Sequence, residues 1–122
     1  MATNYQQAGE VITWTNSTGS AVAANAIVVI GHMVGIALES IANGASGSVG
    51  VEGVYFNVPK VSGAVFTQGE KLILDVSAGA FDDSAATPAT GDITGAAVAW
   101  VAGGNGQLTC TIKLTPGNAT RT

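Results

Sequence analysis

Residues 48–83 place the strongest constraint on the fold, because they join strand-like runs through turns and contain no cluster of catalytic residue types. Residues 49–56 alternate between two faces, with Val54 and Phe56 on the same face, and a period of two is that of a β-strand. Pro59 is expected to end this run, since proline has no backbone N–H for a continuing ladder. The segment therefore predicts a β scaffold.

Six further runs have the same character: they are short, rich in apolar and β-branched residues, and bounded by turn-forming residues. They cover residues 11–15, 26–30, 33–39, 71–76, 93–102 and 108–114. Between the second and third runs, Gly31 and His32 fit either a tight turn or a bulge within one long strand. Residues 103–106, with the sequence GGNG, predict a hairpin turn, because an Asn-Gly pair suits positive φ.

The last of these runs alternates most clearly. The residues expected to point inward are Leu108, Cys110, Ile112 and Leu114. Residues 77–92 are expected to be a surface loop, and Pro116 with the polar residues after it is expected to end the fold.

Short strands separated by glycine turns predict an all-β fold: a single small β-sandwich or barrel-like, jelly-roll-like domain of short antiparallel strands. This domain covers residues 1–122, with residues 1–8 as an N-terminal arm and residues 115–122 as a polar tail. A chain of 122 residues buries enough surface on folding to need no disulfide or metal.

Charge argues against nucleic acid as a partner. The formal net charge is −4, and the four cations are dispersed among eight acids, at Lys60, Lys71, Lys113 and Arg121. Phosphate binding requires clustered cations that release counterions. Charged residues make up only 10% of the chain, so the surface consists largely of Thr, Ser, Asn and Ala and favours docking and self-association.

Nothing in the sequence predicts a membrane partner or secretion. The most apolar stretch, residues 21–38, is interrupted by Asn25 and His32 and is too short and broken for a membrane span. The first ten residues lack the basic and apolar regions of a signal peptide. A lone cysteine, Cys110, fits a reducing compartment, and synthesis in the cytoplasm is therefore expected.

Candidate chemical sites are weak, and no catalytic residue, cofactor or metal ligand is predicted. His32 is the only histidine, and Cys110 is expected on an inward face, where only His32 could supply the neighbour that a thiolate nucleophile needs. The acids that could gather around a cation are Asp82, Asp83 and Asp92, which are expected instead to be solvated loop residues. Residues 44–50 are rich in glycine but lack the Gly-Lys-Ser/Thr ending of a phosphate loop. Trp14 and Trp100 are expected to be core or interface anchors.

Four segments together resemble a known family. They are NYQQAGEVITWT (residues 4–15), AIVVIGHMVGIAL (26–38), VEGVYFNVPKVSGAVFTQGEKLILD (51–75) and TGAAVAWVAGGNGQLTCTIKL (94–114). The chain resembles the small capsid cement, or decoration, proteins of tailed bacteriophages. Some members carry the label of a predicted recombinase, but this chain has neither the phosphate loop nor the basic channel of a strand-exchange ATPase.

The resemblance implies a structural virion protein, without enzymatic activity, on the outside of a phage capsid. Such a protein is made in the cytoplasm of the host bacterium, binds the major capsid protein at junctions between subunits, and stabilises the head. The resemblance also implies a homo-oligomer, with a trimer favoured over a dimer. The alternative is another self-assembling virion component, such as a tail-tube or head-completion protein.

In related decoration proteins a terminal arm often contacts the capsid, and the polar, uncharged start of this chain is unlikely to pack by itself. The predicted capsid contacts are Ala2, Thr3, Asn4, Tyr5, Gln6 and Gln7. The loop of residues 80–91 is the second candidate.

Overall fold

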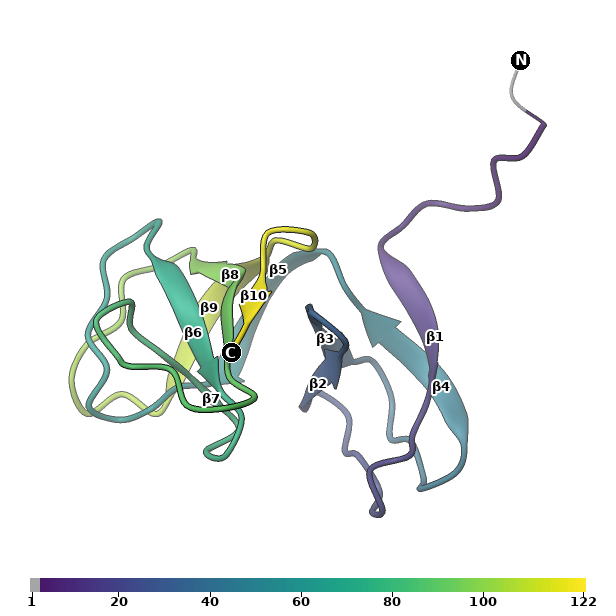
Figure 1. Ribbon diagram of the computed structural model, residues 1–122, viewed down its shortest axis with the longest axis horizontal. Coiled ribbons are helices and arrows are strands. Elements are labelled where there is room, and N and C mark those ends of the chain that lie inside the picture. The colour runs from purple at the N-terminus through teal and green to yellow at the C-terminus, as the bar shows by residue number, and fades with distance from the viewer. Residues whose placement is uncertain (1–2) are drawn as a thin grey trace.

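A computed structural model describes residues 3–122 and consists of two antiparallel β-sheets (Figure 1). The strands are β1 (Val11–Thr15), β2 (Ile27–Ile30), β3 (Met33–Ala37), β4 (Ser46–Gly50), β5 (Gly53–Pro59), β6 (Lys71–Asp75), β7 (Ala80–Asp82), β8 (Ile93–Ala99), β9 (Thr109–Leu114) and β10 (Thr120–Arg121). The prediction of a small all-β fold of short antiparallel strands is confirmed. No helix that could cross a membrane occurs among the described residues.

The first sheet has the strand order β1-β4-β3-β2. Its β2–β3 connection is a tight turn, which decides between the two interpretations of the sequence: Ile30 pairs with Met33 across it. Gly31 has a φ of 60° at the first central position, as a type II′ hairpin turn requires, and glycine adopts this angle without steric cost. β2 and β3 are therefore separate strands.

Asn16, which follows β1, is a buried polar residue of this half. Its amide nitrogen donates to the backbone oxygens of Ser20 and Ile41, at 2.8 and 3.0 Å. Its side-chain oxygen accepts hydrogen bonds from the backbone N–H and the hydroxyl of Thr18, at 3.0 and 2.7 Å. A buried amide is stable only when its donors and acceptors are satisfied in this way. Asn16 thereby joins the turn after β1 to the segment before β4.

The chain passes from the first sheet to the second between β4 and β5. The expectation of one strand over residues 49–56 is wrong, because β4 ends at Gly50 and β5 begins at Gly53. Gly53 has a φ of 113°, an angle that side chains on an L-residue rarely permit, and it redirects the chain at this point. The expected end at Pro59 is confirmed.

The second sheet curls toward a barrel. Its strand order is β5-β9-β8-β6-β7, and β10 pairs with β8 beside this path. An isolated parallel bridge between Lys60 and Phe81, with a 2.9 Å hydrogen bond from Val61 N–H to the Phe81 oxygen, brings the β5 and β7 ends together. Each sheet is built from consecutive strands of the chain rather than by alternation between sheets. The barrel-like part of the prediction corresponds to this second sheet.

Two short strands lie where the sequence predicted none. Within the expected loop of residues 77–92, β7 pairs with β6 and buries Ala80 and Phe81. Within the expected polar tail, β10 pairs with β8, and Thr122 exchanges backbone hydrogen bonds with Gly91 and Asp92. Both strands have only two or three residues, too few to show a period. The tail therefore belongs to the fold.

The β8–β9 connection is longer than predicted. β8 ends at Ala99 rather than at residue 102, and β9 begins at Thr109, so that Leu108 lies outside the strand and is 69% exposed rather than inward. Gly106 has the expected positive φ, at 88°. Within β9 the inward residues Cys110, Ile112 and Leu114 are buried as predicted.

The two sheets share one large apolar core. Val34 and Ile36 of β3 belong to the same buried cluster as Leu72, Phe81 and Ile93 of the second sheet. A smaller cluster lies within the first sheet, comprising Val28, Ala37, Ile41, Val49 and Val51. Arg121 of β10 also donates a 3.0 Å hydrogen bond to the Gly31 oxygen in the β2–β3 turn. Contacts far apart in sequence thus hold the halves together.

Candidate binding surfaces

The described residues, 3–122, contain no group of three His, Cys, Asp or Glu side chains placed to hold a metal ion. His32 is exposed in the β2–β3 turn. The glycine-rich segment, residues 44–50, forms β4 and the turn before it, and Gly47 lies against the Ile41 side chain. A strand packed in this way does not present the free N–H groups of a phosphate loop.

Cys110 is a buried thiol and not a nucleophile. Its side chain is 8% exposed, and its Sγ lies 3.4 Å from the Val58 oxygen. Burial raises the pKa of Cys110 to about 11, against an opposing effect of the Lys60 charge. Because the thiolate is the reactive form, the thiol stays unreactive near neutral pH. Cys110 therefore acts as a small apolar core residue, as its inward position predicted.

The acids of residues 82–92 hold backbone groups. Asp92 is 6% exposed, so the expectation that it is solvated is wrong. Its carboxylate accepts hydrogen bonds from the backbone N–H groups of Val76 and Ala89, at 3.1 and 2.9 Å. Asp83 likewise accepts from Val65 and Ala85. These carboxylates have a structural role as acceptors that organise turns.

Glu70 holds the loop of residues 80–91, the second candidate for a capsid contact. One carboxylate oxygen accepts from the backbone N–H and the hydroxyl of Ser84, both at 2.9 Å. The other accepts from the N–H of Thr67 at 3.1 Å. These hydrogen bonds, first from Ser84 and then from Thr67, lower the pKa of Glu70, because they favour the charged form. The loop therefore leaves β7 in a defined direction.

The N-terminal arm extends away from the body of the molecule (Figure 1). Ala2 lies outside the described residues, and the predicted contacts Thr3, Asn4, Tyr5, Gln6 and Gln7 are all exposed. Tyr5 is 77% exposed, and the side chain of Gln7 donates a 3.3 Å hydrogen bond to the Val11 oxygen. The arm is thus accessible to a partner. Its contact with a capsid stays a prediction.

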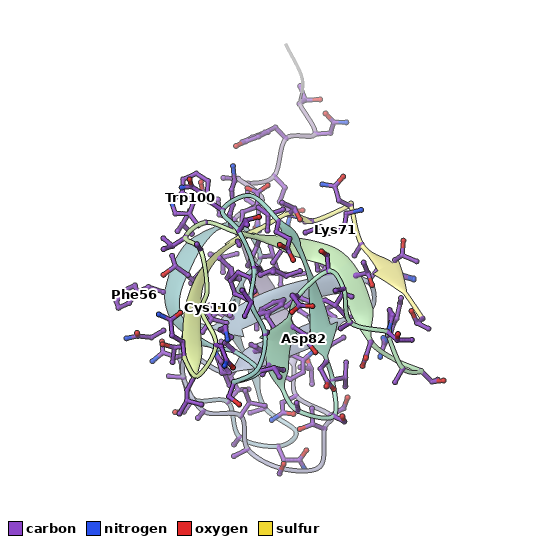
Figure 2. All side chains as sticks on the ribbon, turned by 90° about the vertical axis from the view of Figure 1, so that its left-hand side faces the viewer. Phe56, Lys71, Asp82, Trp100 and Cys110 are labelled. Atoms are coloured by element: carbon purple, nitrogen blue, oxygen red, sulfur yellow. The ribbon has the colours of Figure 1, made fainter. Side chains whose placement is uncertain are left out.

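A second accessible surface was not predicted: an aromatic face on the outside of β5, β9 and the end of β8. Phe56 is 75% exposed and Trp100 is 48% exposed. Figure 2 shows both side chains on the same side of the molecule. Alternation in the sequence placed Phe56 on one face of its strand, but the pairing of β5 with β9 joins residues fifty or more positions apart and has no local signal.

An apolar hollow lies between the sheets. Its volume is about 470 Å³, and side chains from both sheets line it, among them Trp14, Val29 and Leu74. Trp14 is half-buried against the smaller cluster, in agreement with its predicted role as an anchor. The lining has few polar groups that could orient a ligand. The hollow therefore does not indicate a particular substrate.

A protein-family model described as phage cement protein matches residues 6–114, which span nearly all of both sheets. The chain belongs to this family. No significant match to a curated protein or to a solved structure was found.

Membership in the phage cement family indicates a structural role associated with a phage capsid, and it confirms the resemblance of the four sequence segments. The match begins at Gln6, so the first residues of the arm lie outside it. It ends before β10. The matched part therefore covers the aromatic face in full and the arm only in part.

Proposed function

We propose that this protein binds the outer surface of a phage head at junctions between major capsid subunits and stabilises the head. The match to the cement family over residues 6–114 is the observation that carries the proposal. Bridging adjacent subunits adds buried area at each junction, and many such contacts over a lattice resist rupture together. A homo-oligomer, with a trimer favoured over a dimer, provides several equivalent contacts to one junction.

We further propose that the N-terminal arm makes the first contact with the capsid. Residues 3–8 are exposed and uncharged. An extended, uncharged segment can add a strand to an exposed sheet edge, where main-chain hydrogen bonds provide the affinity. The loop of residues 80–91 is the second candidate, since residues 84, 85, 87, 89 and 90 in it are exposed.

Heads that lack the protein provide the direct test. Purified protein is mixed with undecorated mature heads, and electron cryo-microscopy is combined with a measurement of the temperature at which heads release DNA. We expect density at the capsomer junctions and a higher release temperature. Density confined to the tail or neck, or self-assembly into tubes without heads, would instead support the tail-tube or head-completion alternative.

The arm is tested by deletion of residues 1–8, with a same-length Gly/Ser replacement of residues 3–7 as the matched variant. No backbone hydrogen bond links residues 3–8 to the sheets in the described part of the chain, so both variants should stay folded. We expect the deletion variant to lose binding to heads, whereas the Gly/Ser variant, which keeps the main-chain donors and acceptors but loses the side chains and is more costly to order, should bind more weakly than wild type. Full binding by the deletion variant would exclude the arm.

A further inference from the structure

The aromatic face consists of two rows of side chains that run across three strands. In the first row, Lys113 of β9 pairs with Val54 of β5 on one side and with Val98 of β8 on the other. In the second row, Trp100 donates its backbone N–H to the Thr111 oxygen at 3.0 Å. Strands in a sheet lie about 4.8 Å apart, so the rows form one continuous surface.

A β-bulge completes the second row. Tyr55 pairs with Ile112 and Val58 with Cys110, so that Phe56 and Asn57 together lie opposite Thr111. Asn57 has a φ of 55°, which asparagine tolerates better than other side-chain-bearing residues. Bulges redirect side chains at sheet edges. Here the bulge leaves Phe56 outward and 75% exposed.

Trp100 is held in place on this face. The Lys113 ammonium lies 5.7 Å from the centre of the Trp100 ring, within the range of a cation–π interaction. The side chain of Gln68 donates a 3.1 Å hydrogen bond to the Trp100 oxygen. An aromatic side chain that is fixed before binding loses little entropy on binding. Trp and Phe are also residue types that dominate the energy of protein interfaces.

The face carries a cation, Lys113, in the middle of its first row, and acids lie beside it. Glu10, Glu52 and Lys113 line one shallow hollow at its edge. Burial, and next the negative charge of Glu10, raise the pKa of Tyr55, which places the Glu10 charge close to the same strand. A face with a central cation, apolar side chains on both sides of it and two acids nearby can pair with a second copy of itself, so that Lys113 of each copy meets an acid of the other.

We propose that the aromatic face is the surface through which copies of this chain associate, with Phe56 and Trp100 buried at the contact and Lys113 of one copy facing Glu52 of the next. The inference rests on the homo-oligomer of the proposed function, and because a face that pairs with itself forms a two-fold contact, it selects the dimer over the trimer favoured there. β5 is an edge strand of its sheet, and a large exposed aromatic side chain on an edge strand promotes uncontrolled association unless a specific partner covers it. A second copy supplies both the apolar and the charged complement.

The first test compares association in sedimentation equilibrium. The double variant Phe56→Ser with Trp100→Ser should associate at least about 100-fold more weakly than the wild type, because truncation of an interface anchor has large effects. Val65→Ser is the matched control, since Val65 is also an exposed apolar residue, at 57%, but lies in a loop bonded to Asp83. Its association should be unchanged. Circular dichroism verifies that all variants are folded.

The second test exchanges charges between copies. Lys113→Glu and Glu52→Lys should each weaken self-association, because each places like charges across the contact. A mixture of the two variants should associate more tightly than either alone, since glutamate then faces lysine again. A rearrangement within one chain cannot produce this recovery on mixing.

Three results would overturn the inference: a wild-type protein that stays monomeric at about 1 mM, a double variant that associates as tightly as wild type, or a double variant that stays oligomeric but loses head binding. The last result would assign the face to the capsid. If the double variant dissociates while the wild type binds no heads at all, the inference is supported and the proposed function fails.

Discussion

The two halves of this molecule bury their apolar side chains to different extents. Within residues 3–122, the first sheet has a cluster of five buried side chains of its own. In the same part of the chain, the second half contributes most of a cluster of fifteen, and two members of that cluster, Val34 and Ile36, come from the first sheet. The curled sheet therefore has a core that it nearly completes by itself, whereas the first sheet depends on the second for much of its burial.

Each half also has a buried polar side chain that holds its loops, and the two use different chemistry. Asn16 both donates and accepts, and so it stabilises one compact turn region. Lys60, 4% exposed, only donates: its ammonium bonds the backbone oxygens of Val61, Ser62 and Gln107, at 2.9, 3.4 and 3.3 Å. A neutral amide is buried at a lower desolvation cost than a cation. Asn16 and Lys60 anchor loops in a similar way, but Asn16 should contribute more to the free energy of unfolding, because its burial costs less.

The largest expected effect is that of Phe81→Ala, in the core of the second half. Phe81 is fully buried, and truncation of such a side chain costs about 3–5 kcal/mol. Because Val34 and Ile36 share this core, both sheets should unfold in one transition at a lower urea concentration. Val65→Ala, at an exposed position outside the aromatic face, is the control. Separate unfolding of the first sheet would contradict the dependence described above.

The second effect is that of Asn16→Ala, measured as the free energy of unfolding in urea. The substitution leaves the oxygens of Ser20 and Ile41 without their buried donor, and we expect a loss of about 2 kcal/mol. Ser17→Ala, at the following exposed residue, should change stability by under about 0.5 kcal/mol. Equal stability of the Asn16 variant and the wild type would show that water replaces the amide.

Lys60→Met should have a smaller effect than Asn16→Ala. The change removes a donor from three backbone oxygens but also removes the cost of burying a cation, so we expect a net loss of about 1 kcal/mol. The measurement is again urea unfolding, at the same pH and salt. A loss well above that of Asn16→Ala would reverse the comparison between the two halves.

The smallest effect concerns pH. The pKa of Glu70 is lowered from its ordinary value of 4.5 by hydrogen bonds from Ser84 and Thr67. A lowered folded-state pKa gives stability that is present above the unfolded pKa and is lost as pH falls through the folded pKa. Glu70→Gln should therefore be less stable than wild type at pH 7, and the difference should shrink below pH 4.5. A difference that stays constant with pH would contradict a role for the charge.

Local patterns in the sequence predicted much of this fold, and non-local pairing explains most of the rest. β1 has the predicted bounds, and the β2–β3 turn follows from Gly31. The break between β4 and β5 was missed because the apolar alternation continues across it, with Gly53 as the one local sign of the change in direction. The short strands β7 and β10 form because β6 and the start of β8, beyond the end of β9, offer open edges, which no local pattern reveals.

The two candidate surfaces also differ in this respect: one has a local signal in the sequence, and the other depends on non-local strand pairing. The polar, uncharged arm could be predicted from composition, and the structure places Thr3 to Gln7 in the open. The aromatic face could not be predicted, because Phe56 and Trp100 come to the same side of the sheet only through β9, which lies between their strands in the sheet but last of the three in the chain. The exposure of Trp100 also depends on where β8 ends, and that end came three residues earlier than predicted.

The consecutive order of the sheets has a consequence for synthesis on the ribosome. Residues 11–50 supply every strand of the first sheet, and they leave the ribosome before β6, β8 and β9 exist. At that stage Val34 and Ile36 have no counterpart to cover them. Nascent chains that expose apolar side chains are prone to aggregate or to recruit chaperones. A slow codon run before residue 71 should therefore lower the soluble yield, whereas one after residue 114 should not.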